Sequence, residues 1–157
     1  LEDPYFKEGS KNYSEQKTKG IGLLPLKTTF LKKKLTRQIN SESFWPCQSK
    51  INGFEIHNGQ TELDNTQALL KINPIFKDLN LGWYKENTKG GTIGGTYIHG
   101  IFENDIWRDQ YINLIRKRKN LPALKTKTSS YKVKRESIIE NLANEFNKHL
   151  NISSLLN

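Results

Sequence analysis

The alternation of apolar and polar residues over the first two thirds of the chain predicts β-strands. The clearest case is 51–57, which alternates with period two, as a half-buried strand does. We expect Phe54 and Ile56 to lie on one face of this strand. Glu55 and His57 then lie on the other face. Further strand candidates are 20–30, 32–40, 66–72, 81–84 and 93–98, while 41–48 and 58–65 have the polar, turn-rich composition of loops.

The period of the apolar residues changes to that of a helix after residue 103. Asn104 is a good helix N-cap, and the helical pattern that follows it ends at Asn120 and Pro122. A basic, Thr- and Ser-rich link occupies 125–130. The segment after Tyr131 is predicted to be an amphipathic helix, because Ile139, Leu142, Phe146 and Leu150 fall on one stripe.

The order of these elements bears on the fold class and on the domain organisation. With 157 residues there is room for one domain, made of a loop at 1–19, mainly strands at 20–100, and two helices with the basic link at 101–157. Strands followed by two helices suggest an α+β fold if taken alone. They suggest the second half of an α/β sheet if further strands and helices precede them. Because the chain opens on Leu1 and a polar, acidic stretch, we expect a piece of a longer protein.

Composition excludes several classes of protein. One cysteine cannot form an internal disulfide, and the three histidines lack zinc-ligand spacing, so we expect no metal site. No stretch of about 20 apolar residues and no signal peptide is present, which predicts a cytoplasmic protein without a membrane partner. The net charge of +9 raises the possibility of nucleic-acid binding. We favour solvated lysine-rich surface instead, because Lys outnumbers Arg by 20 to 5 and phosphate recognition usually uses arginine forks.

The segment 94–102 is the most informative for chemistry. His99 ends an apolar strand, Gly100 follows it directly, and a helix begins about five residues later. Gly95 and its neighbour remove side chains where a ligand could approach closely, and Gly100 permits a sharp exit from the strand. The competing interpretation, which we would favour for a lone histidine, is an imidazole that caps the strand and bonds a nearby carbonyl.

Three segments in register resemble the carboxyl-terminal glutamine amidotransferase domain of the cobyric acid synthases. They are 22–30 (GLLPLKTTF), 53–61 (GFEIHNGQT) and 95–102 (GTYIHGIF), and the similarity continues to the final helix. The resemblance implies an α/β sandwich of the class I amidotransferase type, of which this chain would be the second half. It also implies a glutamine-hydrolysing, ATP-driven ligase of cobalamin biosynthesis. The substrates would be glutamine and a corrinoid, adenosylcobyrinic a,c-diamide, which is converted to adenosylcobyric acid.

In this resemblance His99 matches the catalytic histidine that activates a cysteine nucleophile. That cysteine is absent from this chain, because Cys47 has no flanking glycines and cannot form the family's elbow. We therefore expect the nucleophile, ATP and Mg²⁺ in the missing upstream half, no cofactor bound by this piece, and no activity from it alone. Ile101 occupies the position where many class I enzymes have an orienting Glu. This implies a Cys–His dyad, with Glu103 as a candidate supporting contact.

His57, Gly95 and Tyr97 are the further candidates for a substrate-lining role, His57 with a structural role as its alternative. The aromatic residues Trp83, Tyr84, Tyr97, Phe102 and Trp107 are most simply core. Two other functions stay open at this point. One is another amidotransferase of the same branch, such as a cobyrinic acid a,c-diamide synthase or a cell-wall glutamine amidotransferase, and the other is a basic nucleic-acid-binding module.

Overall fold

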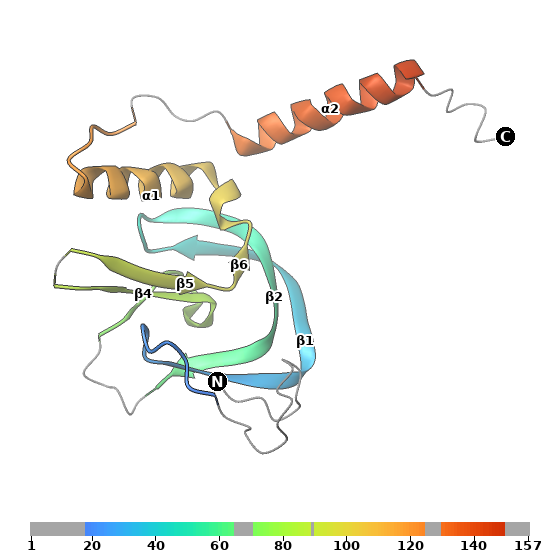
Figure 1. Ribbon diagram of the computed structural model, residues 1–157. Helices are drawn as coiled ribbons and strands as arrows, with labels where there is room; N and C mark the ends of the chain where they lie inside the picture. The colour runs from blue at the N-terminus through green and yellow to red at the C-terminus, as the bar shows by residue number, and fades with distance from the viewer. Residues whose placement is uncertain (1–17, 65–70, 89, 125–129, 150–157) are drawn as a thin grey trace.

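The computed structural model describes residues 18–64, 71–88, 90–124 and 130–149 (Figure 1). Strands come first and two helices follow, as the sequence predicts. The elements are β1 (Leu26–Ser43), β2 (Ser49–Leu63), β3 (Asn73–Pro74), the 3-10 turn η2 (Leu79–Leu81), β4 (Gly82–Glu86), β5 (Thr92–Thr96), β6 (Ile98–His99), the 3-10 turn η3 (Ile101–Glu103), α1 (Asp105–Arg118) and α2 (Tyr131–His149). Most of the predicted loop at 1–19 lies outside the described residues.

A long, curved antiparallel hairpin of β1 and β2 dominates the molecule (Figure 1). Its register runs from Leu26 opposite Leu63 to Ser43 opposite Ser49, with a shift between Phe30 and Leu35. The prediction of separate strands at 20–30 and 32–40 is therefore wrong, since β1 is continuous from Leu26.

The predicted loop at 58–65 is also wrong as far as Leu63. Its polar residues remain in strand because their backbone completes the ladder with β1. The predicted loop at 41–48 shrinks to 44–48, and the predicted strand at 66–72 falls mostly outside the described residues.

The strands form two small sheets, with the order β1-β2-β6 in one and β3-β4-β5 in the other. Every strand pair in the described ranges is antiparallel. The predicted strand at 93–98 is thus divided: β5 ends at Thr96, and the chain crosses to the first sheet, where β6 pairs with β2. This crossing brings His99 to the edge of the long hairpin.

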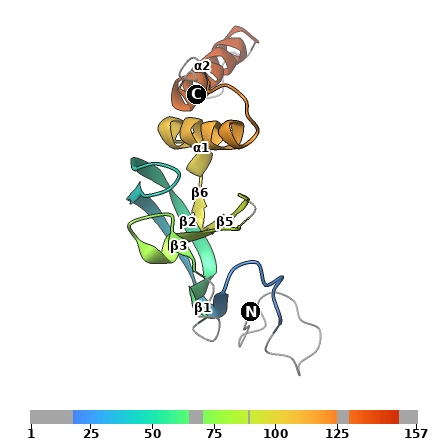
Figure 2. The ribbon, with the colours of Figure 1, turned by 90° about the vertical axis from the view of Figure 1, so that its left-hand side faces the viewer.

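The hydrophobic core lies between the two sheets and α1 (Figure 2). Trp107 of α1 is 4% exposed, and its indole N–H donates to the carbonyl oxygen of Trp45 at 2.9 Å. Tyr111 stacks on Trp107 with ring centroids 5.2 Å apart. The buried residues of the core are Ile39, Ile51, Ile75, Phe76, Leu81, Ile98, Ile101 and Trp107.

The alternation along β2 is present, and its inner face is mixed, because it carries the core residue Ile51 together with polar residues. Glu55 is 3% exposed and Thr61 is buried, whereas Phe54 is 52% exposed. Apolar character therefore predicts the buried face correctly at Ile51 and wrongly at Phe54. The buried face is fixed by what the other elements offer, namely partners for the Glu55 carboxylate.

The two helices differ in how they are held. Asn104 is the N-cap of α1 as predicted, but its side chain bonds outward to β2: its amide donates to the Asn52 carbonyl at 2.9 Å, and its carbonyl oxygen accepts the Asn52 N–H at 2.8 Å. The helix ends where predicted, with Asn120 in the left-handed region at φ 55°.

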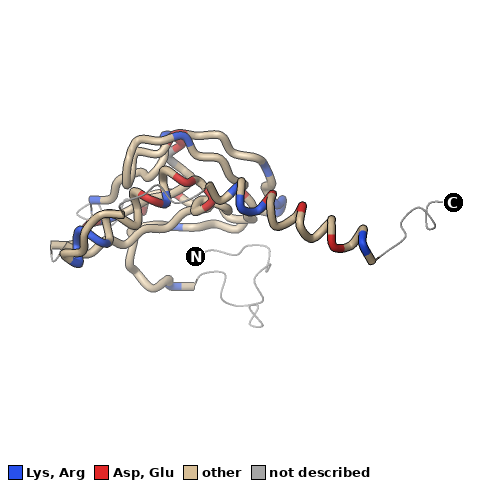
Figure 3. The backbone as a smooth tube through the Cα atoms, turned by 90° about the horizontal axis from the view of Figure 1, so that it is seen from above, with Lys and Arg blue, Asp and Glu red and all other residues tan. Residues whose placement is uncertain are grey.

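Helix α2 forms as predicted, but none of its described residues is buried, so the apolar stripe with Leu142 and Phe146 is exposed. Figure 3 shows Lys and Arg as well as Asp and Glu along this helix. Neither of these two helices, in the range that the structure describes, is long and apolar enough to cross a membrane.

Close packing at Gly53 gives a first prediction. A Cβ at Gly53 would lie 2.5 Å from the carbonyl oxygen of His99 and 2.5 Å from Cγ2 of Ile98, so Gly53→Ala must push β6 away from β2. We expect a loss of about 1–3 kcal/mol of stability, the usual cost of overpacking. Thermal melts of the variant and the parent protein measure it. Gly20→Ala is the matched control, because its Cβ meets nothing within 4 Å; equal melting temperatures for both variants would contradict the prediction.

Candidate functional site

His99 stands at the end of a strand before a glycine, as the sequence predicts, but that strand is not the predicted 93–98. His99 ends the two-residue strand β6, opposite Phe54 of β2, and Gly100 turns the chain away with φ 79° in the left-handed region. The turn η3 and then α1 follow directly. The His99 side chain is exposed, and no hydrogen bond joins its ring to another described residue. Among the described residues the imidazole therefore has no hydrogen-bond partner, and none of their carbonyl groups makes the contact of the strand-capping kind.

His99 lines a cavity of about 370 Å³, which is within the size range of small-molecule sites. Glu103 faces Arg135 of α2 in this cavity, with carboxylate and guanidinium 3.5 Å apart. Glu103 is thus paired with an arginine and makes no described hydrogen bond to His99. The lining residues are polar for the most part: Gln38, Asn52, Gly53, Phe54, His99, Gly100, Glu103, Asn104, Tyr131, Lys132 and Arg135.

Asp105, at the start of α1, ties the two helices together near this cavity. Its carboxylate accepts the backbone N–H of Tyr131 at 2.9 Å. That hydrogen bond, with further ones from Ser130 and Arg108, lowers the pKa of Asp105 below its ordinary value. The Asp105 carboxylate is therefore an anion at neutral pH, and in this form it accepts the N–H of the first residue of α2.

His57 and Tyr97 meet in a second place, on the inner face of the hairpin. Their rings stack with centroids 4.1 Å apart and planes 25° apart. His57 Nε2 lies 2.7 Å from one oxygen of the Glu55 carboxylate, and Arg37 Nε donates to the other oxygen at 2.6 Å. Because residues opposite each other in a ladder share a face, Glu55 goes with Ile98 on the inner face and Phe54 with His99 on the outer face. His57 and His99 are thus on opposite faces of one sheet.

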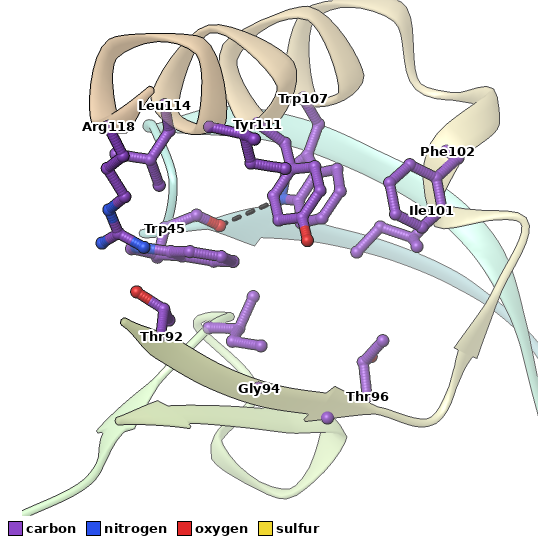
Figure 4. Close-up of a pocket in the computed structure, with 13 residues that line it drawn as sticks. Trp45, Thr92, Gly94, Thr96, Ile101, Phe102, Trp107, Tyr111, Leu114 and Arg118 are labelled. Atoms are coloured by element: carbon purple, nitrogen blue, oxygen red, sulfur yellow. Dashed lines mark hydrogen bonds between the residues drawn. The ribbon is translucent and has the colours of Figure 1, made fainter. Parts of the chain in front are cut away.

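Gly95 lies in a third place. It belongs to β5 and lines a cavity of about 280 Å³ between that strand and α1 (Figure 4). Figure 4 shows the rings of Trp45, Trp107 and Tyr111 on the helix side of this cavity and Gly94 on the strand side. The structure therefore brings together only His57 and Tyr97 of the four candidate residues.

The aromatic residues predicted to be core differ in how deeply they are buried. Trp83 and Trp107 are buried, Tyr84 packs partly buried against the core through Trp45, and Phe102 is 52% exposed. Phe102 still makes edge contacts with Trp107 and Tyr111, with centroids 5.3 and 5.5 Å apart. It forms the outer rim of this aromatic cluster.

Cys47 lies in the loop 44–48 between β1 and β2. This loop connects two strands, so the thiol does not lie on a strand-to-helix elbow. The sequence likewise predicts that Cys47 cannot form such an elbow. Its carbonyl oxygen accepts the Ser43 hydroxyl at 2.7 Å, and Cys47 is not among the residues that line the His99 cavity.

Comparison with known proteins supplies the family. The sequence profile of the CobB/CobQ-like glutamine amidotransferase domain matches residues 1–107, more than half of the chain. The chain belongs to this family. Similar proteins include the cobyric acid synthases of Prochlorococcus marinus strains MIT 9312, 85% identical over 157 residues, MIT 9515, 72% over 158, and NATL2A, 42% over 156. The match covers 99–100% of this chain but 31% of the length of each relative.

In this amidotransferase domain, the residues that sequence reasoning missed are Arg37 and Glu55. The alternation placed Glu55 and His57 on one face, two positions apart, so their pairing was available from the pattern. Arg37 joins them because it lies opposite Glu55 in the β1–β2 register. That register could not be derived from the sequence.

The pairing of Arg37 with a buried carboxylate gives a second prediction. Removing one partner of a buried ion pair leaves the other charge uncompensated; since Arg37 is 56% exposed, we expect Arg37→Ala to cost about 1–3 kcal/mol of stability. Chemical denaturation measures the difference. Glu86→Ala is the control, because Glu86 is 58% exposed in its pair with Arg118, and such pairs contribute about 0–1 kcal/mol. Costs in the reverse order would contradict the assignment of Glu55 as the buried partner.

Proposed function

We propose that this chain supplies the catalytic histidine, His99, of the glutaminase site of a cobyric acid synthase. The whole enzyme would carry out glutamine-dependent, ATP-driven amidation of adenosylcobyrinic a,c-diamide to adenosylcobyric acid. One observation carries the proposal: the His99 imidazole is exposed beside a cavity lined mostly by polar residues, has no hydrogen-bond partner among the described residues, and stands at the end of a strand that Gly100 terminates. The relatives named as cobyric acid synthases support this product over those of other amidotransferases.

In this proposal His99 accepts and donates protons during the hydrolysis of glutamine. A cysteine thiol gives its proton to the imidazole, and the thiolate attacks the side-chain amide carbon of glutamine. The imidazolium then returns the proton to the departing nitrogen, so that ammonia leaves and a thioester remains. Water hydrolyses the thioester to glutamate with the same imidazole as general base. Because neither ring nitrogen of His99 bonds a described residue, both are available for this exchange.

The nucleophile and the ATP site belong, in this proposal, to the two thirds of the relatives' length that this chain does not span. Cys47 lies in the wrong kind of turn. The described residues contain no group of three or more His, Cys, Asp or Glu side chains that could hold a metal ion, and the sequence has no P-loop. Both observations support the proposal that Mg²⁺ and ATP bind in the other part of the whole enzyme. The class I sandwich, with this chain as its second half, is part of the same proposal.

The arginines argue against the alternative of a nucleic-acid-binding module. Arg37, Arg108, Arg118 and Arg135 pair with carboxylates, and Arg116 donates to the carbonyl of Pro122. All five arginines of the chain are therefore used within it. Phosphate recognition needs guanidinium groups whose donors face outward.

A third prediction tests the role of His99 in the full-length protein that carries this chain. His99→Ala should lower glutamine-dependent amidation by about 10²-fold or more, the scale for losing a general base. Amidation with free ammonia should persist, because it bypasses glutamine hydrolysis. Steady-state rates with each nitrogen donor provide the measurement. His149→Ala is the control, since His149 is 78% exposed on α2; an equal loss of both rates in His99→Ala would refute the catalytic role.

A fourth prediction concerns this chain in isolation. We expect no ammonia release from glutamine, because its single cysteine lies outside the His99 cavity. A coupled assay for ammonia measures it, with the full-length protein as the positive control. Release that disappears in Cys47→Ala would show that Cys47 is the nucleophile and that the proposed division of the site is wrong.

A further inference from the structure

Tyr97 is held at both ends by the inner face of the hairpin. Its ring stacks on the His57 imidazole at 4.1 Å, and its hydroxyl bonds the hydroxyl of Thr61. Thr61 in turn bonds Thr28 across the hairpin at 2.6 Å. The backbone N–H of Tyr97 donates to the Leu81 carbonyl at 2.9 Å. Ring, hydroxyl and backbone are thus fixed by three separate contacts.

The His57 ring, on which Tyr97 rests, is itself immobilised. Glu55 is 3% exposed, and its carboxylate joins His57 on one side and Arg37 on the other. A carboxylate bonded by a guanidinium accepts hydrogen bonds, so the Nε2–H of His57 donates to it. Both the tautomer and the plane of the imidazole are therefore set by Glu55.

Tyr97 directly precedes the strand that carries His99. That strand, β6, has two residues and two paired positions with β2, Ile98 opposite Glu55 and His99 opposite Phe54 (Figure 1). So short a ladder orients a side chain weakly. The contacts of Tyr97 fix the chain on the N-terminal side of His99, and on the other side Gly100 turns the chain away in the left-handed region, with φ 79°.

We infer that Arg37, Glu55, His57 and Tyr97 form a positioning unit that sets the orientation of the His99 imidazole, with His57 acting through Tyr97 and touching neither substrate nor nucleophile. The inference rests on the proposed function of His99. It assigns the His57 side chain to a role on the inner face of the sheet, opposite the face that His99 presents. Small displacements of a catalytic group lower rates sharply, by up to about 10²-fold for 1 Å, which is why such support matters.

The test measures kcat and KM for glutamine, and the ammonia-dependent rate, in the full-length protein. Tyr97→Leu removes the stack and the hydroxyl; we expect a fall in glutamine-dependent kcat of about 10-fold or more, KM within about 3-fold, and an unchanged ammonia-dependent rate. Tyr97→Phe keeps the stack and should recover at least about a third of the parent kcat. Glu55→Gln tests the same support without creating a cavity and should show the same division between kcat and KM, with a fall in kcat of about 3-fold or more.

Tyr84→Leu is the matched control, because Tyr84 is a partly buried tyrosine that stacks on Trp45 at 4.9 Å, away from β6. It should lower both rates alike or neither. A raised KM with unchanged kcat in Tyr97→Leu would place Tyr97 against the substrate, and an equal loss of both rates would make it merely structural; either result overturns the inference. If Tyr97→Leu does not fold, the same two results in Glu55→Gln overturn the inference. A parallel His99→Ala variant that keeps its glutamine-dependent rate would instead refute the proposed function itself.

Discussion

The buried carboxylate of Glu55 is the constraint on which the arrangement of the hairpin depends. Burial of an unpaired carboxylate costs several kcal/mol, so the fold must supply donors, and Arg37 and His57 provide them. The inner face of β2 thus carries both the core residue Ile51 and a carboxylate whose two oxygens are each paired. Since β6 adds to the same strand in fixed register, the inward direction of Glu55 also decides that His99 points outward.

Helix α1 is anchored by polar contacts at positions where an apolar stripe alone would allow it to slide. The paired amides of Asn104 and Asn52 join the start of the helix to β2, and the Trp107 indole bonds the Trp45 carbonyl in the loop at the end of the hairpin. Directional bonds of this kind fix both rotation and translation. The short segment between β6 and α1, which contains Gly100, is therefore held from both ends.

The two faces of the sheet that contains the long hairpin carry different sets of side chains. The inner face carries a satisfied polar cluster that ends at Tyr97. The outer face leaves His99 and the half-exposed Phe54 beside a polar cavity. In the proposed enzyme the nucleophile approaches His99 from this outer face, because the imidazole is exposed there. In that proposal the polar cluster and the reacting groups lie on opposite faces of the sheet.

The sequence by itself determined the turn after His99, both helices, the succession of a strand region and then helices, and the family. These depend on neighbouring residues: Gly100 permits the left-handed turn, Asn104 begins a helix, and Asn120 with Pro122 ends it. Only the tertiary structure decided that 58–63 is strand, that Glu55 rather than Phe54 is buried, and that the predicted strand 93–98 divides between two sheets. The physical reason is that each of these outcomes depends on a partner distant in sequence. The alternation of β2 defines two faces, but only the positions of Arg37 and Ile98 across the ladders determine which of them is buried.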